Sequence, residues 1–146
     1  METLTYSEAK ALIKEIGRFE EASYDHWGLT VLDAENGEYA IAFSKDESDK
    51  AVAEYIKETA WAFVPSFIIE HSEVLDYDEP SRMIIKAIQE QYERGNEAIL
   101  KLIDDLEEFV EDAIRYDGRG HFLSGYDGNE IEINVSDRII YLYRIN

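Results

Sequence analysis

The chain contains no cysteine, only two prolines and no long hydrophobic run. The absence of cysteine excludes disulfide bonds, thiolate catalysis and cysteine-ligated zinc. No stretch approaches the roughly 20 apolar residues that a membrane-spanning helix needs. The first residues also lack the basic and apolar regions of a signal peptide. These absences predict a protein of a reducing cytoplasm that does not interact with membrane.

Basic residues are scarce as well. The chain has 14 Lys and Arg against 33 Asp and Glu, which gives a net charge of −19 over 146 residues. This exceeds the magnitude of about 2–8 that keeps a small domain soluble, and self-repulsion of the surplus destabilises the compact state. Because phosphate would be repelled, direct binding to nucleic acid is disfavoured. We therefore expect the charge to serve binding to a basic partner protein.

The remaining composition is that of a folded protein. Hydrophobic residues make up 45% and aromatic residues 12% of the chain, too much for intrinsic disorder. The length suits one domain with its own core. We predict a single domain over residues 1–146 of the α+β class, in which a small antiparallel sheet of about four or five strands packs against helices.

The first half of the chain carries three helical signals. Thr5 and Glu8 have the spacing of a capping box and open a helix that is expected to fray over residues 17–22. A second helix is expected after residue 45 and should end or kink at Pro65, which disfavours a helical residue before it. Residues 66–71 are expected to restart as a short helix.

Strands are expected in two places. Asn36-Gly37 is a strong hairpin-turn signal and lies between the β-rich segments 27–33 and 38–44. Near the C-terminus, three further segments alternate or are β-rich: 121–124, 130–135 and 138–145.

The longest helical pattern covers residues 81–116. Gly95-Asn96 could end one helix and cap the next, which would give a helical hairpin. The apolar pattern nevertheless passes through the glycine without a jump, which is typical of one long bent helix. Both alternatives stay open at this point.

The negative charge is concentrated in this helical part. Residues 70–117 carry 15 acidic and 5 basic residues, whereas residues 118–146 carry 4 and 3. Six carboxylates crowd one stretch: Asp104, Asp105, Glu107, Glu108, Glu111 and Asp112. On a continuous helix, Asp104, Glu108 and Asp112 would form a row with about 6 Å between neighbours. Such a run can be an ordinary solvated helix face, or it can imitate a row of backbone phosphates.

A glycine-rich stretch, Asp117 to Gly128, is the most distinctive local segment, with four glycines within eleven residues. It matches neither a phosphate-binding loop nor a Ca²⁺ loop. An enzyme could use His121 as a general base, oriented by Asp117 or Asp127, with Arg119 holding an anion. In the alternative that we favour, Arg119 and His121 brace a turn between the helical part and the sheet.

The other histidines and the aromatic residues give weaker signals. His26 and His71 are isolated in sequence, so either is expected to be a packing or surface residue rather than a metal ligand. Four aromatic residues could line a ligand pocket, although core packing is the expectation that we favour: Trp27, Trp61, Phe63 and Phe67.

Three segments carry a resemblance: Asp117 to Gly128, Trp61-Ala62-Phe63 with Phe67, and the ending Tyr141 to Asn146. Together they resemble a group of small uncharacterised acidic proteins of phages and mobile elements, over the C-terminal two thirds of the chain. The resemblance implies a genetic context, with the bacterial host's cytoplasm as location, and no site residues. Its similarity to DNA-mimicking antirestriction and anti-CRISPR proteins is one of kind and not a motif match.

The sequence therefore predicts a phage-type, non-enzymatic inhibitor that presents the six carboxylates to a basic nucleic-acid-binding defence protein of the host. No metal and no cofactor is expected, and a homodimer is compatible with the chain. A first alternative is a small adaptor or regulatory module that docks through an apolar patch, with the acid serving solubility. A second is a small hydrolase centred on His121.

Overall fold

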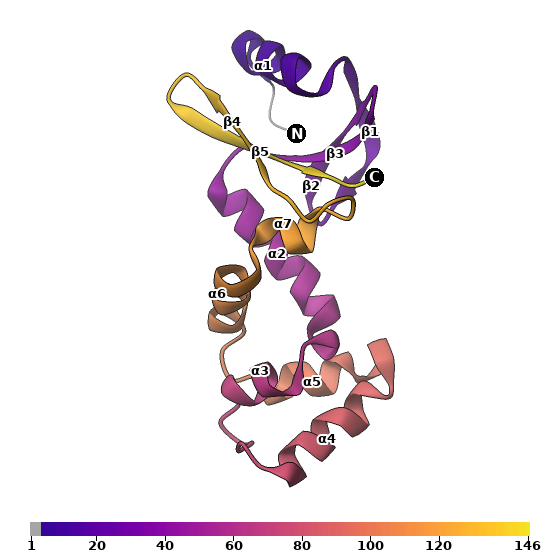
Figure 1. The fold of residues 1–146 in the computed structure, drawn as a ribbon, viewed down its shortest axis with the longest axis vertical. Helices are drawn as coiled ribbons and strands as arrows, with labels where there is room; N and C mark the ends of the chain where they lie inside the picture. Colours follow the sequence, from indigo (N-terminus) through magenta and orange to yellow (C-terminus); the bar gives the residue numbers. More distant parts are fainter. Residues whose placement is uncertain (1–3) are drawn as a thin grey trace. The chain divides into compact units, whose positions relative to one another are not determined.

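The computed structural model describes residues 4–146, which form two compact units (Figure 1). The first unit takes in the chain up to Val52 and again from Asp117, and the second takes in the residues between them. No helix in the described range is both long and apolar enough to cross a membrane. The predicted α+β class is confirmed, and the single domain over residues 1–146 stays a prediction.

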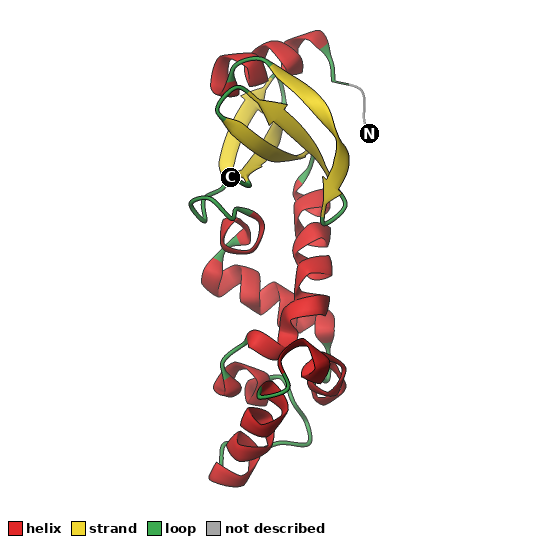
Figure 2. Cartoon of the chain, turned by 90° about the vertical axis from the view of Figure 1, so that its right-hand side faces the viewer, coloured by secondary structure: helices red, strands yellow, loops and turns green. Residues whose placement is uncertain are grey.

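The first unit is built on a five-stranded antiparallel sheet, which agrees with the predicted four or five strands, and its strand order is β1-β2-β3-β5-β4 (Figure 2). Its strands are β1 (Phe19–His26), β2 (Leu29–Ala34), β3 (Gly37–Ala42), β4 (Ile131–Val135) and β5 (Arg138–Arg144). The hairpin between β2 and β3 is confirmed, with Ala34 paired to Gly37. Gly37 has φ +151°, and an added Cβ would lie 2.3 Å from the carbonyl oxygen of Asn146, so this position requires glycine.

One face of the sheet packs against α1 (Tyr6–Ile16). The predicted cap is present, because Thr5 Oγ1 accepts a hydrogen bond from the Glu8 amide at 3.2 Å. Leu12 and Ile16 are buried in the core that the helix shares with the sheet. The predicted fraying over residues 17–22 is wrong, because β1 already begins at Phe19.

The C-terminal part of this unit contains a second correction. Residues 121–124, predicted as a strand, belong to the helix α7 (Arg119–Leu123) and its C-cap. The segment is too short for its alternation to decide between helix and strand. Gly120 allows the helix to lie against the backbone of residues 128–130, where a Cβ would come within 2.6 Å of Gly128 O.

The second unit is helical apart from its connections. The chain enters it along α2 (Lys45–Thr59), which begins in the first unit. Its other elements are η1 (Ala60–Ala62), α3 (Pro65–Glu70), α4 (Glu79–Gln89), η2 (Tyr92–Gly95), α5 (Asn96–Leu102) and α6 (Leu106–Asp117). Pro65 is the first residue of α3, where the missing N–H costs nothing, so the predicted restart is confirmed.

The segment 81–116 is neither one long helix nor a simple two-helix hairpin. An added Cβ at Gly95 would lie 2.4 Å from Ile88 O. The helical pattern is interrupted before Asn96, as one alternative required. It breaks again between α5 and α6, where Ile103 is extended with φ −79° and ψ 122°. Asp104 therefore lies before α6, and the predicted row of three carboxylates on one continuous helix is wrong.

Candidate functional site

Two features of the acidic stretch favour the start of α6: a capping side chain before the helix and negative charge in its first turn. Asp105 Oδ1 accepts a hydrogen bond from the Glu108 amide at 3.2 Å, which satisfies one of the free N–H groups there. Glu107 and Glu108 occupy the first turn, where negative charge interacts favourably with the helix dipole. Phe109 and Val110 are buried on the opposite side. The acids thus stabilise the helix start as well as charging its surface.

Five of the six predicted carboxylates are solvent-exposed, and within residues 4–146 none of these five forms an ion pair: Asp104, Asp105, Glu107, Glu108 and Glu111. Asp112 differs from them. Its side chain is only 15% exposed, and it lies within ion-pair distance of His71 and Arg115. The predicted set therefore divides into an exposed, unneutralised group and one partly buried, paired member.

A hollow of about 240 Å³ opens beside the start of α6. Its lining combines the end of α3 and the residues after it with the loop before α6 and α6 itself: Glu70, His71, Ser72, Glu73, Asp104, Asp105, Glu108 and Asp112. Six of these eight residues are carboxylates. The sequence prediction missed Glu70 and Glu73, because nothing in the chain pattern links residues 70–73 to residues 104–112.

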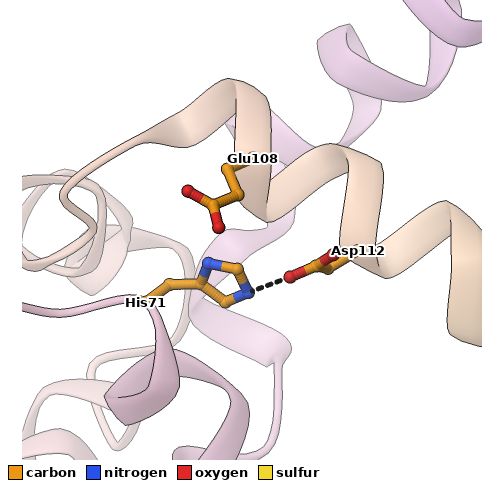
Figure 3. A group of neighbouring side chains, drawn as sticks. All are labelled: His71, Glu108 and Asp112. Atoms are coloured by element: carbon orange, nitrogen blue, oxygen red, sulfur yellow. Dashed lines mark ion pairs between the residues drawn. The ribbon is translucent and has the colours of Figure 1, made fainter.

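His71 lines the hollow, and its imidazole lies near the carboxylates of Glu108 and Asp112 (Figure 3). Its side chain is 6% exposed, and its ring packs against Phe67 and Phe109 with centroid distances of 5.0 and 5.2 Å. The Asp104 amide donates to the His71 carbonyl at 2.8 Å, which ties the loop before α6 to the end of α3. His71 is thus a packed residue, and its ring also faces two carboxylates.

Nε2 of His71 lies 3.1 Å from Oδ2 of Asp112. The two atoms do not have hydrogen-bond geometry, so Nε2 is buried without a hydrogen-bond partner. Asp112 Oδ1 forms an ion pair with Arg115 Nη1 at 2.8 Å. Glu108 lies on the same face of α6 as Asp112, one turn earlier, and its carboxylate also lies near the imidazole (Figure 3).

The glycine-rich stretch has a different environment in the first unit. Arg119 donates to Glu130 at 2.7 and 3.1 Å and to Asp49 at 3.1 Å. Burial opposes the charge on Arg119, but these acceptors outweigh it and raise the pKa of the guanidinium. Arg119 also lies over the Tyr141 ring, with 4.9 Å between the guanidinium carbon and the ring centroid. Arg119 therefore braces the fold, as the favoured alternative predicted, whereas the same expectation for the exposed His121 stays a prediction.

His121 is exposed, and within the described chain neither Asp117 nor Asp127 forms a hydrogen bond with it. Asp127 instead accepts from the Ser124 hydroxyl and from the Asn129 amide. The orienting carboxylate that a general base needs is therefore not supplied by the residues we had proposed.

The four aromatic residues do not come together as one group. In the second unit, Phe63 and Phe67 stack with a centroid distance of 5.5 Å, and both rings contact Phe109. Trp61 contacts Tyr92 edge-on. Trp27 lies in the first unit, where it contacts His26. These contacts make the phenylalanines part of the packing beneath α6.

Comparison of the chain with known protein families, with curated proteins and with solved structures finds no match. The likeness to proteins of phages and mobile elements therefore stays a prediction from sequence.

Proposed function

We propose that this protein is a non-enzymatic inhibitor of the anti-defence kind, a nucleic-acid mimic that presents a carboxylate surface to the basic cleft of a nucleic-acid-binding protein. The observation that carries the proposal is the group of five exposed carboxylates at α6 that no cation neutralises within residues 4–146. Glu70 and Glu73, across the hollow, extend the same negative field.

The spacing of these groups suits a cleft that binds a polynucleotide. Each strand of DNA carries one negative charge per about 3.4 Å of helix axis, and because the strand winds around that axis its phosphates are farther apart than this rise. Residues one turn apart on α6 are separated by about 5–6 Å, and several carboxylates fall within the Debye length of about 10 Å at 0.1 M salt. A cleft lined with Lys and Arg therefore experiences them together and not as isolated charges. Electrostatic attraction of this kind speeds association, and the affinity falls steeply as the salt concentration rises.

The test is capture of partners from a bacterial lysate, followed by competition. Immobilised protein is expected to retain basic nucleic-acid-binding proteins at about 50 mM salt and to release them by about 200 mM. Excess duplex DNA or RNA should displace the same proteins, because both ligands would occupy one cleft. Captured proteins that neither salt nor nucleic acid releases would contradict the proposal.

A pair of charge-reversed variants identifies the surface. The first carries Asp104→Lys, Glu107→Lys and Glu111→Lys, which leaves Asp112 and its ion pairs intact. The control variant makes the same change in charge at exposed acids of the sheet: Glu20→Lys, Glu21→Lys and Glu132→Lys. We expect the first variant to lose the partner and the control to retain most of the binding. Equal loss in both would mean that net charge alone, and not the α6 surface, drives the interaction.

A second candidate, an adaptor that docks through apolar contacts, has its own observation. Large hydrophobic side chains of α4 and the segment before it are exposed: Val74 (74%), Tyr77 (66%), Met83 (61%) and Ile84 (49%). Binding through this surface would be nearly indifferent to salt, and Met83→Lys would abolish it. The same capture experiment therefore separates the two functions.

A further inference from the structure

Three potential metal ligands converge in the second unit. One ligand atom each from His71, Glu108 and Asp112 lies within 4.8 Å of the others. Glu108 and Asp112 are four positions apart on α6, so both carboxylates project from one face of the helix. His71 reaches the same point from the end of α3 (Figure 3).

The buried imidazole sets this group apart from an ordinary acidic surface. Nε2 of His71 is buried and has no hydrogen-bond partner, although a buried polar nitrogen normally has one. The Ser72 hydroxyl, which lines the same hollow, is buried and unpartnered too. Nε2 and Asp112 Oδ2 are 3.1 Å apart. Two ligands that bind one tetrahedral ion at about 2.0–2.2 Å are separated by about 3.3–3.6 Å, so a small outward shift of this pair would space it for a shared ion.

The geometry points to a binding site for a divalent transition-metal ion, with His71, Glu108 and Asp112 as its protein ligands. One nitrogen and two carboxylate oxygens are ligands that Zn²⁺ accepts, whereas Mg²⁺ and Ca²⁺ prefer oxygen alone. Three protein ligands leave a coordination position for water or for a group of a partner molecule. Glu108 is exposed and can adjust its rotamer to close the remaining distance.

The surroundings support the ligands. Arg115 holds Oδ1 of Asp112 at 2.8 Å, which orients the carboxylate so that Oδ2 faces His71. The arginine side chain is 70% exposed, so solvent screens its repulsion of a cation. The other carboxylates of the hollow make the local field strongly negative and would attract a divalent ion: Glu70, Glu73, Asp104 and Asp105.

The first experiment uses the full chain, freed of metal with EDTA and titrated with ZnCl₂ in a calorimeter. We expect one Zn²⁺ to bind per chain, and a large excess of Mg²⁺ not to displace it. Weak binding of many ions that Mg²⁺ abolishes would show diffuse attraction to an acidic surface and would overturn the inference. In NMR spectra, the ring nitrogens of His71 should shift on addition of Zn²⁺, and those of His26 and His121 should not.

A matched pair of variants tests the ligand set. Glu108→Gln and Glu111→Gln each remove one exposed carboxylate from α6, so both change the net charge equally. Loss of a ligand should weaken Zn²⁺ binding at least about 10-fold in Glu108→Gln, while Glu111→Gln stays within about 2-fold. Equal effects, with the same helical signal in circular dichroism, would exclude Glu108 as a ligand and overturn the site.

This inference goes beyond the proposed function and does not depend on it. Glu108→Gln removes one of several charges, so it should affect binding of a basic partner no more than Glu111→Gln does. Failure of the metal site would leave the salt-dependent capture unchanged, and failure of the capture would leave Zn²⁺ binding unchanged.

Discussion

The hydroxyl of Tyr143 donates a hydrogen bond to Oε1 of Glu130 at 2.5 Å in the interior of the first unit. The Ser48 hydroxyl hydrogen-bonds to the same phenol oxygen at 2.9 Å, and Arg119 donates to both carboxylate oxygens of Glu130. Tyr143 is fully buried. The network connects β5 to α2, to α7 and to the residue before β4, so its polar groups fix how these elements meet.

Removing the phenol oxygen should therefore destabilise the protein. Tyr143→Phe takes one donor from Glu130 and leaves Ser48 without its partner. The expected loss is about 1–3 kcal/mol in the free energy of unfolding, measured by urea denaturation. The dependence of that free energy on urea concentration should not change. Tyr6→Phe is the control, because Tyr6 is 83% exposed. A loss below about 0.5 kcal/mol for Tyr143→Phe would show that the network contributes little.

Alkaline pH should weaken the same network. Burial, followed by the hydrogen bond to Glu130, raises the pKa of Tyr143 above its usual 10.0. The stability that this shift contributes is fully present below pH 10.0 and is lost as the pH rises toward the higher folded value. The difference in stability between the wild type and Tyr143→Phe should shrink between about pH 9 and 11. A constant difference over this range would contradict the assignment.

Acidic pH should also weaken this network, because it protonates Glu130. Burial raises the pKa of Glu130, but the hydrogen bonds from Arg119 and Tyr143 outweigh it and hold the pKa below the usual 4.5. This stability is present above pH 4.5 and is lost as the pH falls through the lower folded value. Glu130→Gln should therefore be less stable than the wild type at neutral pH, and the difference should narrow in acid. Thermal unfolding in buffers of about pH 3 to 7 measures both.

The buried side-chain amide of Asn96 connects α5 to the backbone at the end of α2 and in η1. Asn96 Nδ2 donates to the Lys57 carbonyl at 2.6 Å, and its Oδ1 accepts from the Trp61 amide at 3.1 Å. Asn96→Ala would leave both backbone groups without this partner, so we expect a loss of about 1–3 kcal/mol in urea denaturation. Asn134→Ala, at an exposed position of β4, should change stability by less than about 0.5 kcal/mol. Comparable losses in the two variants would show that the Asn96 contacts are not special.

Short-range signals in the sequence predicted the fold well. The hairpin at Asn36-Gly37, the cap at Thr5 and the helix that begins at Pro65 all follow from the chemistry of one or two residues. β1 was missed because Phe19–His26 is rich in charge and only Phe19 of its side chains joins the main core as a partly buried residue. Such a strand is held by its backbone hydrogen bonds to β2, and no local sequence pattern predicts that pairing.

The candidate site was only half predictable. The carboxylates of α6 were visible as a charge run, but the break at Ile103 that places Asp104 on a loop depends on tertiary packing. His71 seemed isolated because its partners lie 37 and 41 residues away in sequence. A cluster assembled from the residue after α3 and from α6 leaves no spacing motif in the sequence, so it becomes visible only in the folded chain.

The division of the chain also has a consequence for synthesis. β3 ends at Ala42, but its neighbour β5 begins only at Arg138, so the ladder between them must wait for the last residues to leave the ribosome. The helices of residues 53–116 need no such late strand and are contiguous in the nascent chain. Local contacts form faster than distant ones. We therefore expect the helical insert to be ordered first, while the unfinished sheet still has an unpaired edge.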